Sequence, residues 1–467
     1  MVTNTAGNDR APGGTGAAVA DTASAAAAAA AAIETFAAQA DEHPPQHFGF
    51  SYLDIASARR QAEALRLWSG SPTSRRESHP CPTELDLAGL VIPAKDLYPV
   101  AGMPTTYGAR APQECAPAQT TEPFLAGLMA RGAVIPGKTA TSEMGLTAYC
   151  EPIDQPAPGN PLLFGATPGG SSSGAGVAVA RGLVAAAHGS DGGGSLRVPA
   201  ASCAAVGFKP SHDPAAGLAT QGFITTDLRL TAQLHRLPWP GEDPSACGQP
   251  GVVVGLMTTP LFVRGSQVHP RWAAGAERAA ARLEEAGVKV RTVQPIREAD
   301  EVFGIFKTLL LSGAARLTSP ASTMSAYLQD QGRRLPSGAA YRAQTRRRQI
   351  LRLLRQTWQV DVLLTPTLAF DPPPIGSFSG LPPAEDFFEQ TRWTPWGSLF
   401  NLTATAAVSV PIDRPKLAAS PRPPASVHLG SLTLGDAEIL RLAAIAAGSP
   451  ALPPAAPPLP SWSRGQE

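Results

Sequence analysis

The sequence predicts an α/β fold, in which short buried strands alternate with helices around a sheet. The expected strands are apolar runs of about four to eight residues, which is too short for most helices. Because crossover helices let neighbouring strands run in the same direction, we expect a substantially parallel sheet. The runs are AVIPG from residue 133, ASCAAVGF from 201, GVVVGLM from 251, VKVRTV from 288, DVLLTP from 361 and AAVSVP from 406, and helical patterns at 271–286 and 435–447 alternate with them.

Helical patterns are also frequent in the first half of the chain. Thr22 and Ser24 can cap a helix that continues through the alanine-rich run to about residue 40. Residues 54–68 and 121–131 have helical patterns as well. The segment AGVAVARGLVAAAH at 175–188 predicts a closely packed helix of small residues.

Three segments, one at each end of the chain and one internal, have compositions that predict little packed structure. Residues 1–17 are rich in glycine, proline and polar side chains, which predicts a disordered N-terminal segment. Proline-rich stretches at 412–425 and 450–460 predict a surface loop and a tail, because proline fixes φ and removes a main-chain donor.

Composition narrows the function classes. A chain of 467 residues, 43% of them hydrophobic, can bury a large core, and its length alone suggests two or three domains. Its 38 Lys and Arg residues balance 37 Asp and Glu residues, so no overall field attracts nucleic acid or an anionic membrane. The five cysteines form no CxxC pair, which disfavours a zinc site or a disulfide framework and fits a reducing cytoplasm. The alanine run at 25–32 is too short and too weakly apolar to span a bilayer, and the N-terminus lacks the basic start of a secretory signal, so we expect a soluble, unexported protein.

The segment HGSDGGGSLRVP at 188–199 has the features of an acyl-transfer site. Gly192, Gly193 and Gly194 leave main-chain N–H groups unshielded and allow positive φ, so the loop can point several donors at one acceptor atom. Ser195 follows them directly. A serine beside converging N–H groups combines a nucleophile with a hole for the oxyanion that forms when it attacks.

Such a serine needs a base to activate it. His188 is the nearest histidine, but its place at the end of a helical pattern favours a helix terminus. A lysine can act as the base if burial keeps its amine neutral. Lys95 follows the apolar run LAGLVIPA, which makes it a candidate, although composition alone would make it a surface cation. Ser171 begins a cluster of three serines just before the predicted helix of small residues. That helix could bring the serine cluster close to the glycine loop at 192–195. The step from Gly170 to Ser171 is one that accommodates a cis peptide bond.

These segments resemble the amidase signature family. The resemblance includes PGGSSSG, GSDGGGSLRVPA and VGFKPS, and it covers most of residues 88–445. It extends to VIPAKD with AGMPTTYG, GAVIPGKTATSEMG, DVLLTPT with PPPIG, NLTATAAVSVP and GDAEILRLAA.

The resemblance implies a catalytic triad. Ser195 corresponds to the acylated nucleophile, Ser171 to the serine after a cis peptide that relays protons, and Lys95 to the buried base. The N–H groups of Gly192, Gly193, Gly194 and Ser195 would form the oxyanion hole, and Asp191, Arg197 and Ser173 would support the loop. The implied reaction is hydrolysis of a small-molecule carboxamide in the cytoplasm, without metal or cofactor and without a nucleic-acid or membrane partner.

The resemblance also implies one large domain with a mixed sheet covered by helices, and a possible homodimer. We therefore expect a domain at 18–448 with a catalytic core at 88–211, between the N-terminal segment 1–17 and a proline-rich tail at 449–467.

Substrate identity is less readable. By position in the family pattern Met144, Tyr149 and Cys150 would line the acyl pocket, although they fit a hydrophobic core equally well. Ser190 and Gly192 stand where the family usually has threonines, and the segment from 212 to about 250 and the motif at 401–411 depart from the family pattern.

Rival interpretations remain open to test. GAVIPGKT at 132–139 matches a phosphate loop, but its strand falls inside the motif. GSSSG matches the nucleophile elbow of α/β-hydrolase esterases, with Ser172 as nucleophile. The basic run at 342–358 could bind RNA, but its apolar residues have the spacing of an amphipathic helix. A glutaminase subunit of a tRNA-dependent amidotransferase would share the triad, and a non-catalytic relative would bind without turnover.

Overall fold

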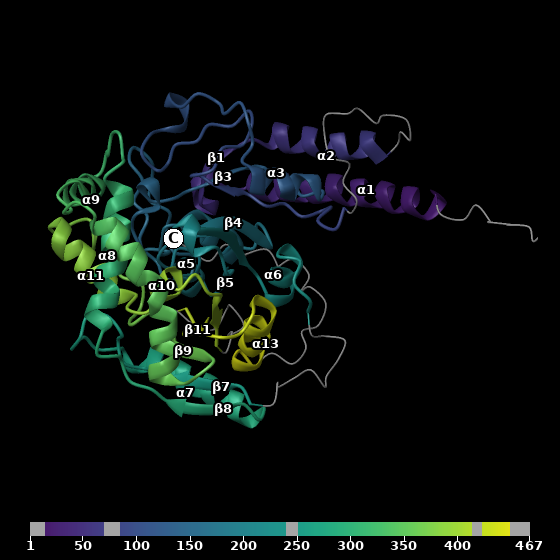
Figure 1. Ribbon diagram of the computed structural model, residues 1–467. Helices are drawn as coiled ribbons and strands as arrows, with labels where there is room; N and C mark the ends of the chain where they lie inside the picture. Colours follow the sequence, from purple (N-terminus) through teal and green to yellow (C-terminus); the bar gives the residue numbers. More distant parts are fainter. Residues whose placement is uncertain (1–14, 70–84, 240–250, 413–422, 449–467) are drawn as a thin grey trace, which may run out of the picture.

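The protein is built on a mixed eight-stranded sheet and a smaller three-stranded sheet (Figure 1). The computed structural model describes residues 15–69, 85–239, 251–412 and 423–448. In spatial order the large sheet consists of β4 (Ala186–Asp191), β6 (Thr220–Thr225), β5 (Val206–Lys209), β10 (Ala407–Pro411), β11 (Ser426–Ser431), β9 (Val362–Pro366), β7 (Val253–Leu256) and β8 (Lys289–Thr292).

The expectation of a substantially parallel sheet is wrong, whereas the mixed α/β sheet implied by the family resemblance is confirmed. Only β7 pairs in parallel, with β8 and β9, and the other pairs in the large sheet are antiparallel. The link from β5 to β6 explains part of this difference. It contains only a short 3₁₀ helix, Pro214–Ala216, whereas a parallel connection needs a crossover of about a dozen residues or more.

Helices cover both faces of the large sheet. Along β9, Val362 and Leu364 pack in one apolar cluster and Leu363 in another, as alternate residues of a strand do. The first cluster includes α6 (Leu228–Leu234), α7 (Pro270–Glu285) and α13 (Asp436–Ala446). The opposite face is covered by α4 (Ser173–Ala180), α5 (Arg197–Ser202), α10 (Ala339–Trp358) and α12 (Leu399–Leu402), and α8 (Ala299–Ala314) packs on α10.

The N-terminal helices form a pair at one end of the molecule (Figure 1). The helix α1 (Thr15–Ala40) packs along α2 (Ile55–Ser69). It begins at Thr15, which is seven residues before the first expected cap, Thr22, and nine before Ser24. The small sheet consists, in spatial order, of β1 (Phe50–Leu53), β3 (Gly137–Thr139) and β2 (Ala94–Lys95), and α3 (Pro123–Ala130) precedes β3 in the chain.

The expected helix at 175–188 is wrong in its second half. The helix α4 ends at Ala180, Gly182 has a φ of +73°, and residues 186–191 form β4. The buried pairing of β4 along β6 outweighs the helix propensity of its alanines. A continuous helix rises about 1.5 Å per residue and would have separated its two ends by roughly 20 Å. The helix followed by a returning strand instead brings the serine cluster and the glycine loop together.

Other predictions agree more closely. The strands β7, β8, β9 and β10 lie where the apolar runs predicted them, and α7, α10 and α13 match their helical patterns. The run from 133 contributes only a bridge of Val134 to Val91 before β3 begins, and the run from 201 splits between α5 and β5. The remaining helices are α9 (Thr323–Arg333), α11 (Pro383–Trp393) and the 3₁₀ turns Pro45–Phe48, Pro112–Glu114 and Glu143–Gly145.

The predicted terminal segments lie outside the described residues, except for 15–17, which begin α1. Most of the predicted loop at 412–425 also lies outside them. Within the described ranges, every helix is either too short or too polar to cross a bilayer.

Candidate active site

Lys95 lies at the end of β2 and is completely buried. Its Nζ is hydrogen-bonded to Ser171 Oγ at 2.8 Å and to Ser190 Oγ at 3.1 Å. Burial lowers the pKa of Lys95 to about 7, although the nearby Asp191 carboxylate opposes that change. A large fraction of this amine is therefore neutral near pH 7 and able to accept a proton.

Ser171 reaches Lys95 from the loop before α4. The peptide bond between Gly170 and Ser171 is cis, as expected from the sequence. Only glycine fits at 170, because a Cβ there would stand 2.5 Å from the carbonyl oxygen of Tyr149. The neighbouring Ser172 points elsewhere, with its Oγ donating to the Ser190 carbonyl at 3.2 Å, and Ser173 Oγ donates to the Gly169 carbonyl.

The glycine loop connects β4 to α5 and is held by the carboxylate of Asp191. Asp191 Oδ1 accepts a hydrogen bond from the N–H of Gly194 at 2.8 Å, and Oδ2 accepts one from Leu196 at 3.1 Å. Gly194 has a φ of +128°, a conformation that favours glycine. Its N–H group is occupied, so the expectation that Gly194 donates to an oxyanion disagrees with this geometry.

Three N–H groups of this loop are available. Within the described part of the chain, those of Gly192, Gly193 and Ser195 have no hydrogen-bond partner, and all three residues line a pocket. A main-chain hydrogen bond from Ser172 N–H to the Ser195 carbonyl, 3.3 Å long, joins the serine cluster to the loop.

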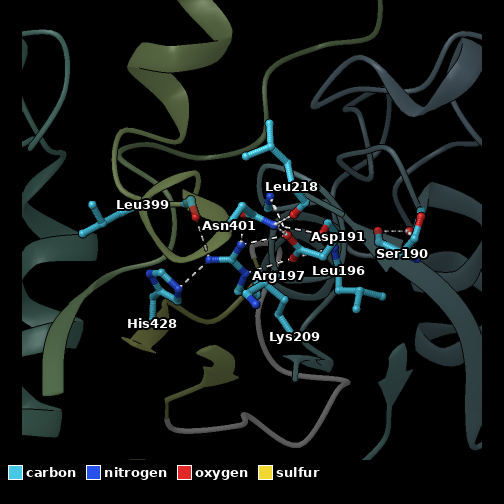
Figure 2. A network of polar contacts seen from close by, with 12 residues as sticks. Ser190, Asp191, Leu196, Arg197, Lys209, Leu218, Leu399, Asn401 and His428 are labelled. Carbon is cyan, nitrogen blue, oxygen red and sulfur yellow. Dashed lines mark hydrogen bonds and ion pairs between the residues drawn. The ribbon is translucent and has the colours of Figure 1, made fainter. Parts of the chain in front are cut away.

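A buried polar network surrounds Asp191, the residue that holds the loop (Figure 2). Arg197 binds Asp191 through two hydrogen bonds of 2.9 and 2.8 Å, and the Asp191 carboxylate in turn accepts hydrogen bonds from the loop. Arg197 also donates to the side chain of Asn401 at 2.8 Å and to His428 Nε2 at 2.8 Å. Burial alone would raise the pKa of Asp191, but Arg197 and other nearby donors outweigh it and hold the pKa below its ordinary value.

The sequence did not single out all members of this network. Asn401 donates to the carbonyl and the carboxylate of Asp191, and its only signal was its position at the start of the motif NLTATAAVSVP. Burial, with Arg197 beside it, holds the pKa of His428 well below its ordinary value, so its neutral ring accepts from Arg197. Lys209 lies nearby and is also buried, which lowers its pKa to about 7.

His188 does not end a helix but lies in the middle of β4. Its Nδ1 accepts a hydrogen bond of 3.2 Å from the main-chain N–H of Lys95, and its Nε2 is 2.9 Å from Gln221 Oε1. Burial lowers the pKa of His188 to about 3, so the ring is neutral. Both ring nitrogens are therefore engaged in holding Lys95 and Gln221, and neither is free to act as a base for Ser195.

A pocket of about 460 Å³ opens over the glycine loop and Ser195. Met144 lines it and is 41% exposed. Tyr149 does not line this pocket, because its ring stacks on Phe378 and its hydroxyl donates to Asp386 at 2.8 Å. Cys150 is also absent from the lining, and burial raises the pKa of its thiol to about 12.

The rival sites lack comparable geometry. Residues 137–139 of the phosphate-loop motif form strand β3, and Lys138 is paired with Asp96 at 3.2 Å. Ser172, the nucleophile of the esterase alternative, is fully buried. The basic run forms the amphipathic helix α10, although Arg347 is buried rather than solvated and donates to the carbonyls of Asn401 and Leu402. Among the described residues, no three His, Cys, Asp or Glu side chains converge as metal ligands would.

A mixed α/β fold in which a buried lysine amine is hydrogen-bonded to a serine hydroxyl, near a glycine-rich loop that presents main-chain N–H groups to a pocket, is typical of serine amidohydrolases. Comparisons with known proteins agree with that class: the sequence profile of the Amidase family matches residues 31–440. This chain belongs to the amidase signature family, and it is a hydrolase that acts on C–N bonds in amides.

Individual relatives cover most of the chain. A protein of Mycobacterium tuberculosis with the amidase name AmiB2 is 30% identical over 422 residues, which is 84% of this chain and 86% of that protein. An amidase homologue of Synechocystis is 30% identical over 392 residues, or 76% and 73% of the two chains. The structure of 6-aminohexanoate cyclic dimer hydrolase superposes with a TM-score of 0.74 and 25% identity, covering 89% of this chain and 92% of that one.

Proposed function

We propose that this enzyme hydrolyses amides through an acyl-enzyme on Ser195, with Ser171 as proton relay and Lys95 as base. Ser195 Oγ attacks the carbonyl carbon, its proton moves to Ser171 Oγ, and the proton of Ser171 moves to the neutral amine of Lys95. The carbonyl oxygen becomes an oxyanion, which accepts hydrogen bonds from the N–H groups of Gly192, Gly193 and Ser195. Each such donor contributes about 3 kcal/mol in comparable sites.

The tetrahedral intermediate then collapses. The ammonium of Lys95 returns its proton through Ser171 to the amide nitrogen, the C–N bond breaks and the amine leaves. Water next loses a proton along the same path and attacks the acyl carbonyl, and Ser195 leaves with that proton. The products are a carboxylate and an amine or ammonia, and the three side chains return to their starting states.

The contact that carries this proposal is the 2.8 Å hydrogen bond between Lys95 Nζ and Ser171 Oγ in a fully buried setting. A lysine with an ordinary pKa would be protonated at neutral pH and could not take the proton. We also propose that the enzyme works in the cytoplasm, which suits Cys115, Cys150 and Cys203, all free thiols.

A fluorophosphonate probe and a panel of amides, anilides and esters test this proposal together. Wild type should become labelled and release amine or ammonia without a second protein, whereas Ser195→Ala should lose both properties. Ser172→Ala is the matched control, because Ser172 lies in the same cluster but contacts a main-chain carbonyl, and it should keep most turnover. Loss of turnover in Ser172→Ala with retention in Ser195→Ala would instead favour the esterase alternative. A requirement for a partner protein would favour the glutaminase subunit.

A further inference from the structure

The wall of the pocket that faces the glycine loop is aromatic. Phe303 and Phe306 of α8 and Phe387 of α11 line it. The ring of Phe303 stacks on Phe306, with centroids 6.0 Å apart, and lies 6.3 Å from Phe387. A Cβ placed on Gly193 would stand 3.1 Å from Phe306, so a group beside the bound carbonyl has to pass this ring.

The described lining of this pocket carries a positive charge. Arg316, just beyond the end of α8, is the only charged side chain among the described residues that line it. Arg316 is exposed, and in the described part of the chain its guanidinium has no ion pair or hydrogen bond. A second cation, Lys307, lies 5.5 Å from the centre of the Phe387 ring.

The carboxylates that adjoin this wall already have partners. Glu143, next to the lining residue Met144, accepts hydrogen bonds from the N–H groups of Ala321 and Ser322 at 2.6 and 2.8 Å. Asp386, next to Phe387, is buried and accepts from Tyr149 and Gln390. Neither carboxylate lines the pocket, so a cationic substrate group finds no counter-ion among the described lining residues.

We propose that the pocket selects amides whose acyl group has an apolar, preferably aromatic, body and a carboxylate at its far end, which Arg316 binds. This inference rests on the proposed function and adds the substrate class. The guanidinium presents paired N–H donors that match a carboxylate, whereas a terminal ammonium would be repelled by Arg316 and Lys307. An exposed pair of this kind changes kcat/KM by about 1.5- to fivefold.

Three amides of one aromatic skeleton test this selection. They carry a methyl, a carboxylate or an ammonium group at the end of the acyl chain, and chain length is varied to find the best reach. Wild type should give the highest kcat/KM for the carboxylate and the lowest for the ammonium. The preference should disappear in Arg316→Gln, reverse in Arg316→Glu and weaken as salt is added.

The matched control is Arg348→Gln, because Arg348 is an exposed arginine on α10 that does not line the pocket. This variant should keep the wild-type order of substrates. Equal rates for the three amides in wild type, or an unchanged order in Arg316→Gln, would overturn the inference while Ser195-dependent hydrolysis leaves the proposed function standing. Absence of any Ser195-dependent hydrolysis would refute the proposed function itself.

Discussion

The pH dependence of amide hydrolysis is the most direct measure of the state of Lys95. Catalysis needs the neutral amine, so kcat/KM should rise with pH and follow the fraction of Lys95 that is deprotonated. With the pKa lowered to about 7, roughly a tenth of the molecules are competent at pH 6, half at pH 7 and about nine tenths at pH 8. With the ordinary value of 10.5, only about one molecule in 3000 would be competent at pH 7.

Few other groups near Lys95 can produce such a profile. The pKa of His188 is lowered to about 3, that of Cys150 is raised to about 12, and that of Asp191 is held below its ordinary value. None of these groups titrates between about pH 5 and 9. Lys209 is the exception, because burial lowers its pKa to about 7 as well.

The assay is therefore kcat/KM for one uncharged amide across about pH 5 to 9, measured for wild type and for Lys209→Met. Lys209 donates to the Pro210 carbonyl and contacts His212, outside the proton path, so its removal should leave the rise near pH 7 in place. A flat profile, a midpoint near 10, or loss of the rise in Lys209→Met would refute the assignment of Lys95 as the base.

Three further predictions concern the surroundings of the triad. Lys95→Met should abolish turnover yet stabilise the fold by about 2 kcal/mol at pH 7, measured by urea unfolding. The wild-type fold is destabilised because the unfolded lysine binds its proton more tightly than the buried one, and this penalty is absent above pH 10.5 and grows to about 4 kcal/mol as the pH falls to 7. The loss of two hydrogen bonds in the variant offsets part of the gain. Arg197→Met should cost about 3–5 kcal/mol in the same assay, since it leaves the carboxylate of Asp191 buried without its cation, and a change below about 1 kcal/mol would contradict the described network. His188→Leu removes the acceptor for the Lys95 N–H, so it should lower kcat and move the rise of the pH profile to higher pH as water reaches the amine. His188→Asn should restore part of the activity. An unchanged profile in His188→Leu would show that the ring does not position Lys95.

The sequence predicted strands that bury continuous apolar runs and missed strands that mix small and polar residues. The runs that become β9 and β10 are recognisable because both faces of a central strand are buried. The strand β11, SVHLGS, lies between these two but has no such run. Its polar side chains have hydrogen-bond partners inside the fold, for example His428 with Arg197. Those partners are distant in the sequence, so the local pattern of residues does not predict a buried strand here.

The same limit applies to the candidate site. Residue type and spacing made Ser195 and Ser171 candidates, because a glycine-rich loop and a serine cluster have local signatures, whereas the assignment of Lys95 as the base came from the family resemblance. Asn401 could not be selected in this way, since it lies 204 positions from the arginine that it contacts. Likewise, the N–H group of Gly194 is occupied because the Asp191 carboxylate is oriented toward it. The sequence shows which residues are glycines but not how that carboxylate is oriented.

The polar network around Asp191 and Arg197 has a consequence for biosynthesis. Ser195, the proposed nucleophile, is synthesised in the first half of the chain, but Asn401 and His428, which contact Arg197, are made more than 200 residues later. A nascent chain that stops before α12 has the serine and the lysine but lacks the side chains that fix the loop between them. Hydrolytic competence therefore arrives late in translation, after most of the polypeptide has been synthesised.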